Sequence, residues 1–134
     1  MHLSKAEIEV LQFLFDHSGS IRVGELKKNL KKPHSTLNSI IHRLERNGLV
    51  IWQKYGPVTL TETGKNKAAH LSRHHFMLEI LLVEALGMSA QDAHQEALTT
   101  GSTLTCQVID RIAQKYDPSY SACGKKIPNS RECS

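Results

Sequence analysis

The sequence predicts a mainly α-helical protein in which a winged helix-turn-helix precedes a second helical region. Three segments with apolar residues at helical spacing come first, a short pattern of β-forming residues follows them, and a long helical run comes next. We expect residues 1–64 to form the winged helix-turn-helix, residues 65–118 to form a helical domain, and residues 119–134 to form a polar tail that contains cysteines.

The first helix is predicted to begin at a capping box, Ser4-Lys5-Ala6-Glu7, and to end at Gly19. In a capping box the serine and glutamate side chains satisfy N–H groups of the first helical turn. A single apolar stripe along this helix predicts that it packs into the domain core. The residues of that stripe are Ile8, Leu11, Leu14 and Phe15.

Two further helices form the predicted helix-turn-helix. Residues 23–30 make a short helix, and Lys31-Lys32-Pro33-His34 makes the turn, because a proline disfavours the helical conformation in the residue before it. The next helix begins at His34 or Ser35, and Asn47-Gly48 supplies its left-handed C-cap. Its core stripe is Leu37, Ile40, Ile41 and Leu44.

A β-hairpin is predicted next. Residues 49–53 and 58–61 read as two strands, and residues 54–57 between them, Lys-Tyr-Gly-Pro, have the chemistry of a turn. A helix, a helix-turn-helix and then a hairpin is the order of elements in a winged helix.

After Gly64 a long helix is predicted to reach Leu86, with Gly87 closing it. Residues 76–83 are apolar on nearly every side, so this segment is either fully buried or buried on one side within the protomer and on the other against a second copy, and the small size of the chain favours the second arrangement. We therefore predict a homodimer through residues 65–116, which suits two-fold symmetric DNA sites. Two more helices are expected, over residues 90–100 and 103–116.

The charge is unevenly distributed. Residues 1–73 carry twelve Lys and Arg against six Asp and Glu, a net charge of +6, whereas residues 74–134 carry five against seven, a net charge of −2. A basic half next to a winged helix-turn-helix predicts binding to a polyanion, namely double-stranded DNA.

The third helix of a winged helix enters the major groove, where polar side chains near its start reach the base edges. Basic residues in the turn and the wing contact phosphates. For any single residue, an exposed position without a DNA contact explains the sequence as well. The candidates for base contacts are His34, Ser35, Thr36, Asn38 and Ser39, and those for phosphate contacts are Lys31, Lys32, Arg43, Lys54 and Tyr55.

A candidate metal site follows the wing. His75 and Glu79 are four residues apart and share one face of a helix, and His94 lies on the next predicted helix. Two imidazoles and a carboxylate suit Fe(II), Mn(II) or Zn(II), although the first two residues could also be an ordinary helix-surface pair. His70 and His74 share this spacing on a neighbouring stripe, where we expect solvated side chains, with metal ligation as the less favoured alternative.

With these elements in place, the chain resembles the DtxR/MntR family of iron- or manganese-dependent repressors over about residues 4–128. The resemblance implies a homodimeric transcription regulator of the repressor type, whose operator binding responds to a divalent cation: Fe(II) or Mn(II), with Zn(II) as a substitute in vitro. The motifs that carry it are Leu60-Thr61-x-x-Gly64, Arg73-His74-His75, Ala93-His94-Gln95-Glu96-Ala97 and Cys123-Gly124-Lys125-Lys126-Ile127-Pro128.

The resemblance implies two metal sites, of which the ancillary one uses a His, a Glu four residues on and a later His. His75, Glu79 and His94 match it. The primary site takes a Cys or Glu, a Glu and a His. The matching positions hold Leu98, Gly101 and Ser102, none of which supplies those ligands.

A first-helix ligand of the primary site falls at Glu7, for which the capping box is the preferred role. The chain therefore resembles a member that keeps one site and has lost the other, the one that the family uses for activation. The sequence leaves open whether DNA binding depends on metal.

The cysteines Cys106, Cys123 and Cys133 are odd in number and contain no CxxC pair, which argues against a secreted disulfide framework. Cys123 and Cys133 could be inert, a redox pair, or soft ligands for a second ion such as Zn(II), together with Cys106 or a histidine. Glu7, Cys123 and Cys133 are thus the less favoured candidates for metal ligands.

Other classes of protein fit less well. The strongest apolar run, residues 80–86, is too short for a membrane span and contains Glu84, and the first residues lack a signal peptide, so we expect a cytoplasmic protein without membrane contact. With no nucleophile or base beside the candidate metal ligands and no glycine-rich phosphate loop, we expect no enzymatic activity. The alternative is a metal-independent, MarR-like or cysteine/redox-responsive transcription regulator.

Overall fold

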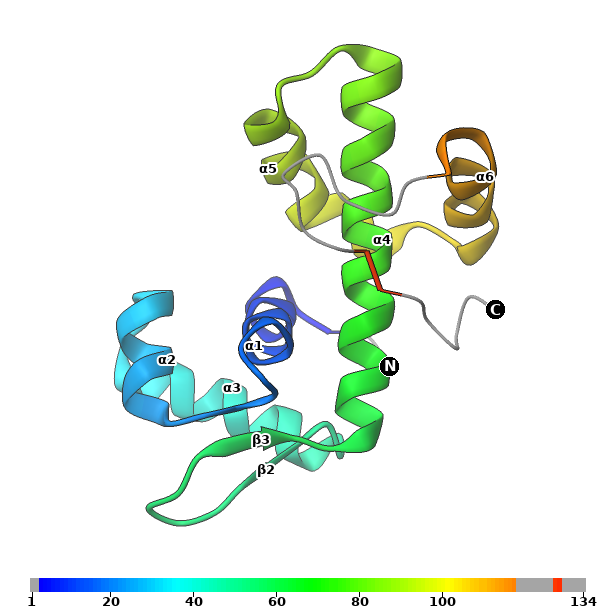
Figure 1. The fold of residues 1–134 in the computed structure, drawn as a ribbon. Coiled ribbons are helices and arrows are strands. Elements are labelled where there is room, and N and C mark those ends of the chain that lie inside the picture. The colour runs from blue at the N-terminus through cyan, green and yellow to red at the C-terminus, as the bar shows by residue number, and fades with distance from the viewer. Residues whose placement is uncertain (1–2, 118–126, 129–134) are drawn as a thin grey trace. The chain divides into compact units, whose positions relative to one another are not determined.

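The computed structural model describes residues 3–117 and 127–128, which separate near Ala68 into two compact units that we describe in turn (Figure 1). Cys123, Cys133 and most of the predicted tail lie outside the described residues. The architecture confirms the predicted class, a winged helix-turn-helix followed by further helices.

The first unit holds three helices and a three-stranded antiparallel sheet with the strand order β1-β3-β2. Figure 1 shows the β2–β3 hairpin, the wing, extending away from the three helices. Leu11, Leu14, Leu26, Ile40 and Leu44 are among the buried side chains that hold these elements together. The elements are α1 (Lys5–Asp16), β1 (Ser20–Ile21), α2 (Val23–Leu30), α3 (His34–Arg46), β2 (Val50–Trp52) and β3 (Val58–Leu60).

The sequence does not predict the strand β1, because two residues are too few to show a periodic pattern. It forms where Gly19, with φ of +81°, turns the chain after α1 and its carbonyl accepts a hydrogen bond from the Leu60 N–H at 2.7 Å. Ser20 then pairs with Thr59 on β3, and their hydroxyl oxygens are 2.9 Å apart. The contact that creates β1 is therefore non-local.

The second unit contains most of α4 (Glu62–Leu86), together with α5 (Ala90–Thr100), the 3₁₀ turn η1 (Gly101–Thr103) and α6 (Cys106–Tyr116). The helices α5 and α6 flank α4 on two sides (Figure 1). The core includes Phe76, Met77 and Ile80 of α4, packed with Ile109 and Ile112 of α6 and with Ile127. Much of the apolar segment 76–83 is thus already buried within one protomer.

Two predicted helix starts are wrong. The helix α4 begins at Glu62, before Gly64, because the Thr61 hydroxyl accepts a hydrogen bond from the Gly64 N–H at 2.9 Å and so caps the helix. The helix α6 begins at Cys106 rather than Thr103, because residues 101–103 form the 3₁₀ turn and the Thr105 hydroxyl accepts a bond from the Val108 N–H at 3.4 Å. In both cases a side-chain cap decides where the helix starts.

Gly64 has a packing role as well. A Cβ atom at this position would lie 1.9 Å from the carbonyl oxygen of Leu49. The first turn of α4 can therefore approach the end of the α3–β2 connection only if residue 64 has no side chain.

Among the described residues, no helix combines the length and the hydropathy of a membrane span.

Candidate metal sites and nucleic-acid interface

The first cluster joins α4 to α5. Glu79 Oε2 lies 2.5 Å from His75 Nε2 and 2.9 Å from His94 Nδ1, and the two imidazole nitrogens are 3.2 Å apart. His75 and Glu79 lie one turn apart on α4, and His94 comes from the middle of α5. The structure therefore brings together the three residues that the sequence singles out as metal ligands.

The charged and polar side chains of this cluster are largely shielded from solvent. The Glu79 side chain is 0% exposed, and His75 is buried beside it, whereas His94 is half-buried. Although Oε2 receives both imidazoles, Oε1 is buried without a hydrogen-bond partner among the described residues. A buried carboxylate oxygen without a partner costs free energy, and a bound cation is one way to satisfy it.

The electrostatics favour an ionised carboxylate. Burial raises the pKa of Glu79, but hydrogen bonds from His75 and His94 and the charges of those rings outweigh it, so the pKa lies below its ordinary value. The cluster thus offers an anionic oxygen and two ring nitrogens at one point.

The spacing of the ligand atoms fits a divalent cation. Metal bonds of about 2.2 Å at right angles place neighbouring ligand atoms about 3.1 Å apart. The distances of 2.9 Å from His94 to Glu79 and 3.2 Å between the imidazoles lie close to this value, whereas the 2.5 Å between His75 and Glu79 would have to lengthen when an ion binds. The residues present therefore fit a divalent ion with nitrogen and oxygen ligands.

A second cluster lies on a neighbouring stripe of α4. Ligand atoms of His70, His74 and Cys106 all lie within 4.8 Å of one another, and Cys106 Sγ is 3.7 Å from His74 Nε2. The prediction that both histidines are solvated is wrong for His74, which is buried, while His70 is half-buried. Periodicity places His74 beside the apolar stripe but cannot show that α6 and η1 cover it.

Burial governs the protonation of His74. Loss of solvent and the neighbouring His70 lower its pKa to about 4, although hydrogen bonds to the backbone of Gly101 and Leu104 act in the opposite direction. The His74 imidazole is therefore neutral near pH 7 and keeps a lone pair for a ligand.

The positions that match the primary metal site of the family that the sequence resembles carry no metal-binding side chain in this chain. Leu98 is half-buried, Ser102 is exposed, and Gly101 is buried where the chain passes close to α4. A Cβ atom at Gly101 would lie 3.0 Å from His75 Cα and 3.3 Å from its N. A larger residue at position 101 would thus displace the backbone that carries His75.

Glu7, the less favoured candidate ligand, makes two contacts within the first unit. It accepts a hydrogen bond from the Ser4 hydroxyl at 2.9 Å, and its Oε1 lies 3.5 Å from Arg43 Nε. Its backbone N–H donates to the Ser4 hydroxyl at 3.2 Å, as expected for the start of a helix. The serine half of the predicted capping box is therefore formed, whereas the Glu7 carboxylate contacts the Ser4 hydroxyl and Arg43.

The candidate base-reading residues lie at the start of α3. His34, Ser35, Thr36 and Ser39 are exposed, and the Ser39 hydroxyl donates to the Ser35 carbonyl at 3.1 Å. Asn38 is half-buried, and its Oδ1 is shielded from solvent.

The candidate phosphate-binding residues differ in how they are held. Lys31 is exposed, but Lys32 Nζ lies 3.4 Å from Glu9, and Arg43 contacts Glu7. On the wing, Lys54 and Tyr55 are exposed, and Lys54 Nζ lies 5.3 Å from the Tyr55 ring centroid. Lys32 and Arg43 therefore also stabilise the first unit through their ion pairs, whereas the side chains of Lys54 and Tyr55 are exposed to solvent.

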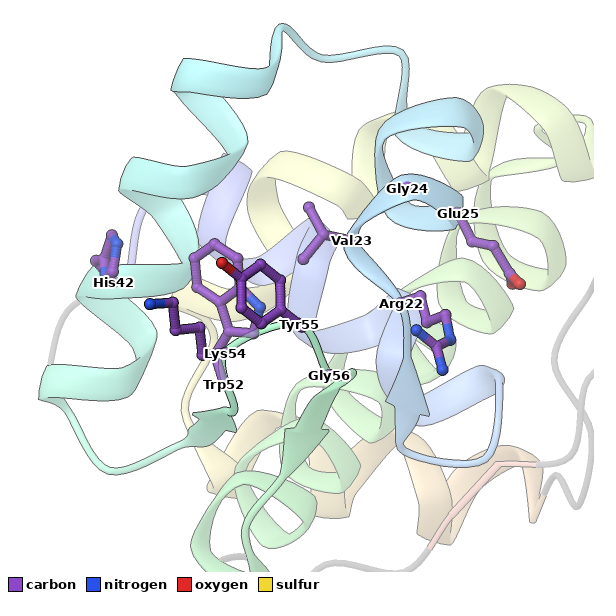
Figure 2. A pocket seen from close by; sticks show the side chains of 9 residues that line it. All are labelled: Arg22, Val23, Gly24, Glu25, His42, Trp52, Lys54, Tyr55 and Gly56. Atoms are coloured by element: carbon purple, nitrogen blue, oxygen red, sulfur yellow. The ribbon is translucent and has the colours of Figure 1, made fainter.

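Between α2, α3 and the wing lies a hollow of about 770 Å³ that sequence reasoning missed (Figure 2). His42 and Trp52 lie on its α3–wing side, with ring centroids 5.3 Å apart. Glu45 fixes this corner, because its Oε2 accepts a hydrogen bond from the backbone N–H of Trp52 at 3.2 Å. Trp52, the single tryptophan of the chain, lies at the base of the wing and is the one residue whose type indicates a surface site there. The lining residues are Arg22, Val23, Gly24, Glu25, His42, Trp52, Lys54, Tyr55 and Gly56.

Comparison with known proteins adds an independent finding. A family model described as the iron dependent repressor, metal binding and dimerisation domain matches residues 61–129. An HTH-type transcriptional regulator of Methanocaldococcus jannaschii is 30% identical over 100 residues, which is 75% of this chain and 80% of that protein.

Two further relatives are longer. The diphtheria toxin repressor of Corynebacterium diphtheriae is 28% identical over 108 residues, which is 80% of this chain but only 48% of the repressor. A solved structure of a manganese-dependent transcriptional repressor in complex with manganese superposes with a TM-score of 0.80 at 25% identity, covering 94% of this chain and 60% of that one. The chain therefore spans about half to two thirds of these two proteins.

Proposed function

Because the chain belongs to the DtxR/MntR family of iron-dependent repressors, we propose that it is a metal-responsive transcription regulator that binds double-stranded DNA as a homodimer. The observation that carries the metal response is the cluster of His75, Glu79 and His94, with its buried carboxylate. The names of the relatives are those of transcriptional regulators and repressors, which agrees with the expectation that the chain is not an enzyme.

We assign Fe(II) or Mn(II) to this first cluster, with Zn(II) as a substitute in vitro. When bound, such a cation supplies positive charge beside the buried carboxylate and the two imidazoles. His75 and Glu79 present their ligand atoms from one face of α4, and His94 presents Nδ1 from α5. Loading the site would therefore fasten α5 to α4.

In this proposal, residues 65–118 form the dimerisation and metal-binding domain. Apolar surface supports pairing with a second copy, because Leu86 and Val108 are exposed and Leu81, Val108 and Ile112 line a shallow groove. Fastening α5 to α4 orders the region through which two protomers pair. DNA binding then costs less conformational entropy, which raises the affinity.

Residues 1–64 form the DNA-reading domain. The exposed polar residues at the start of α3 would enter the major groove, and Lys31, Lys54 and Tyr55 would contact phosphates. Lys32 and Arg43 remain phosphate candidates if DNA competes with Glu9 and Glu7 for them. The excess positive charge of residues 1–73 supports this assignment.

The test uses the full chain, stripped of metal with a chelator. Duplexes are selected from a random library in the presence of Mn(II), and binding of the best one is followed by fluorescence anisotropy without metal, with Mn(II) and, anaerobically, with Fe(II). We expect a gain in affinity of about 5- to 150-fold on metal addition, the usual range for coupling between two sites.

Equal affinity with and without metal would refute the metal response while leaving DNA binding intact. A change in affinity on oxidation alone would instead support the cysteine-responsive alternative. Failure to select any duplex would refute the DNA-binding part of the proposal.

A further inference from the structure

The geometry points to a second cation site in the same unit, built from His70, His74 and Cys106, that takes a thiophilic divalent ion such as Zn(II). The residues come from two helices, since both histidines lie on α4 and Cys106 is the first residue of α6. Their ligand atoms lie within 4.8 Å of one another. This site is separate from the cluster of His75, Glu79 and His94 and does not depend on its function.

The distances suit a tetrahedral ion. Zinc bonds of about 2.1 Å to nitrogen and about 2.3 Å to sulfur place those two ligand atoms about 3.6 Å apart. The observed separation of Cys106 Sγ and His74 Nε2 is 3.7 Å. The two imidazole rings lie with their centroids 4.1 Å apart, so a small movement of His70 brings its nitrogen to the same point.

The local structure prepares these residues for chelation. Histidines four residues apart on a helix present both rings to one side, the spacing that zinc enzymes use on a helix. The His74 ring is buried, and its Nε2 faces the Cys106 thiol. Thr105 caps α6 and so fixes the place of Cys106.

Access and ligand number also fit. His74 is buried, while His70 and Cys106 are half-buried, so an ion can enter from solvent and keep one position for water. With the ion bound, the site would link α6 to α4, whereas the first cluster links α5 to α4.

Ligand chemistry separates the two sites. A thiolate with two imidazoles favours Zn(II), whereas a carboxylate with two imidazoles accepts the harder Fe(II) or Mn(II). Adjacent residues of one helix, His74 and His75, thus serve different ions, because successive side chains on a helix point about 100° apart. A protein with both sites could hold Zn(II) permanently while it responds to Mn(II) or Fe(II).

The experiment titrates Co(II), as a probe for Zn(II), into the full, reduced and metal-free chain. Cobalt bound by a thiolate gives a charge-transfer absorption in the near ultraviolet, which a cluster of histidine and carboxylate lacks. We expect this band to saturate at about one Co(II) per chain and to disappear when Zn(II) displaces the cobalt.

Variants identify the ligands. Cys106→Ser should abolish the band, and His70→Asn should weaken Co(II) binding by about a hundredfold, at least the reduction seen when outer-sphere partners are removed. Cys123→Ser, Cys133→Ser and His75→Asn should keep the band. Far-ultraviolet circular dichroism checks that each variant folds. If Cys106→Ser does not fold, the half-buried His70→Asn change still tests the site.

Absence of the band from the unmodified chain, or its survival in Cys106→Ser, would overturn the proposal. So would its disappearance in Cys123→Ser or Cys133→Ser, or unchanged cobalt affinity in a folded His70→Asn variant. In those cases the 3.7 Å contact is only a cysteine–histidine hydrogen bond.

Discussion

Glutamine at position 79 removes one negative charge and almost no volume from the contact between α4 and α5. In the unmodified chain, Glu79 Oε2 receives His94 Nδ1 at 2.9 Å, and the side chain is completely buried. Glu79→Gln should therefore keep the packing while it replaces the carboxylate of the first cluster by a neutral amide.

The expected magnitude follows from ligand linkage. Mn(II) at a hundred times its Kd stabilises the native chain by about 2.7 kcal/mol. Removal of outer-sphere partners of a metal costs about 10- to 100-fold in affinity, so removal of a direct anionic ligand should cost about a hundredfold or more. At the same Mn(II) concentration the variant then gains only about 0.4 kcal/mol. For a chain of this size, with about 4 °C per kcal/mol, the shifts in Tm are about 10 °C and about 2 °C.

Differential scanning calorimetry of the chelated protein, with and without Mn(II), measures both shifts. Glu84→Gln is the matched control, because Glu84 is an exposed residue of the same helix and the substitution is chemically identical. The control should show the full shift of the unmodified chain.

A Glu79→Gln protein whose Tm still rises by about 10 °C would refute the assignment of Glu79 as a ligand. A chain in which neither the unmodified protein nor the control responds to Mn(II) would refute the first cluster as a manganese site.

Three further predictions concern packing and DNA. Gly64→Ala should lower the free energy of unfolding by about 3 kcal/mol in a urea titration, because its Cβ would lie 1.9 Å from a backbone oxygen. Gly101→Ala should lower Mn(II) affinity about tenfold by calorimetric titration, since its Cβ would press on His75 at 3.0 Å. Lys54→Ala should reduce the salt dependence of DNA binding by about one unit of slope, measured by anisotropy, because the variant loses the positive charge that we propose neutralises one phosphate.

Each of these has a control. Gly24→Ala, in an open position of α2, should raise stability by about 0.5–1 kcal/mol, and a similar gain for Gly64→Ala would contradict the close approach to Leu49. Ser102→Ala changes an exposed residue and should leave Mn(II) affinity unchanged. If it lowers the affinity as much as Gly101→Ala does, pressure of a Cβ at position 101 on His75 does not explain the loss. Lys115→Ala, in the second unit, should keep the salt slope. If both lysine variants behave alike, Lys54 makes no specific phosphate contact.

The sequence alone determined the local elements of this protein. The range Val23–Leu30 is both predicted and observed for α2, because an apolar stripe, a turn and Pro33 are all readable within a few residues. The pairing of His75 with Glu79 follows from helical spacing in the same way. The family resemblance, carried by short motifs, is confirmed by a family model that matches residues 61–129.

Only the tertiary structure decided the features that depend on residues far apart in the chain. It placed Cys106 beside His74, although 32 positions separate them, and it covered a histidine that periodicity predicts to be solvated. It also paired Arg43 with Glu7 and left one oxygen of Glu79 buried without a partner among the described residues. Periodicity reports the face of a helix on which a side chain lies. It does not report what packs against that face, because packing is set by non-local contacts.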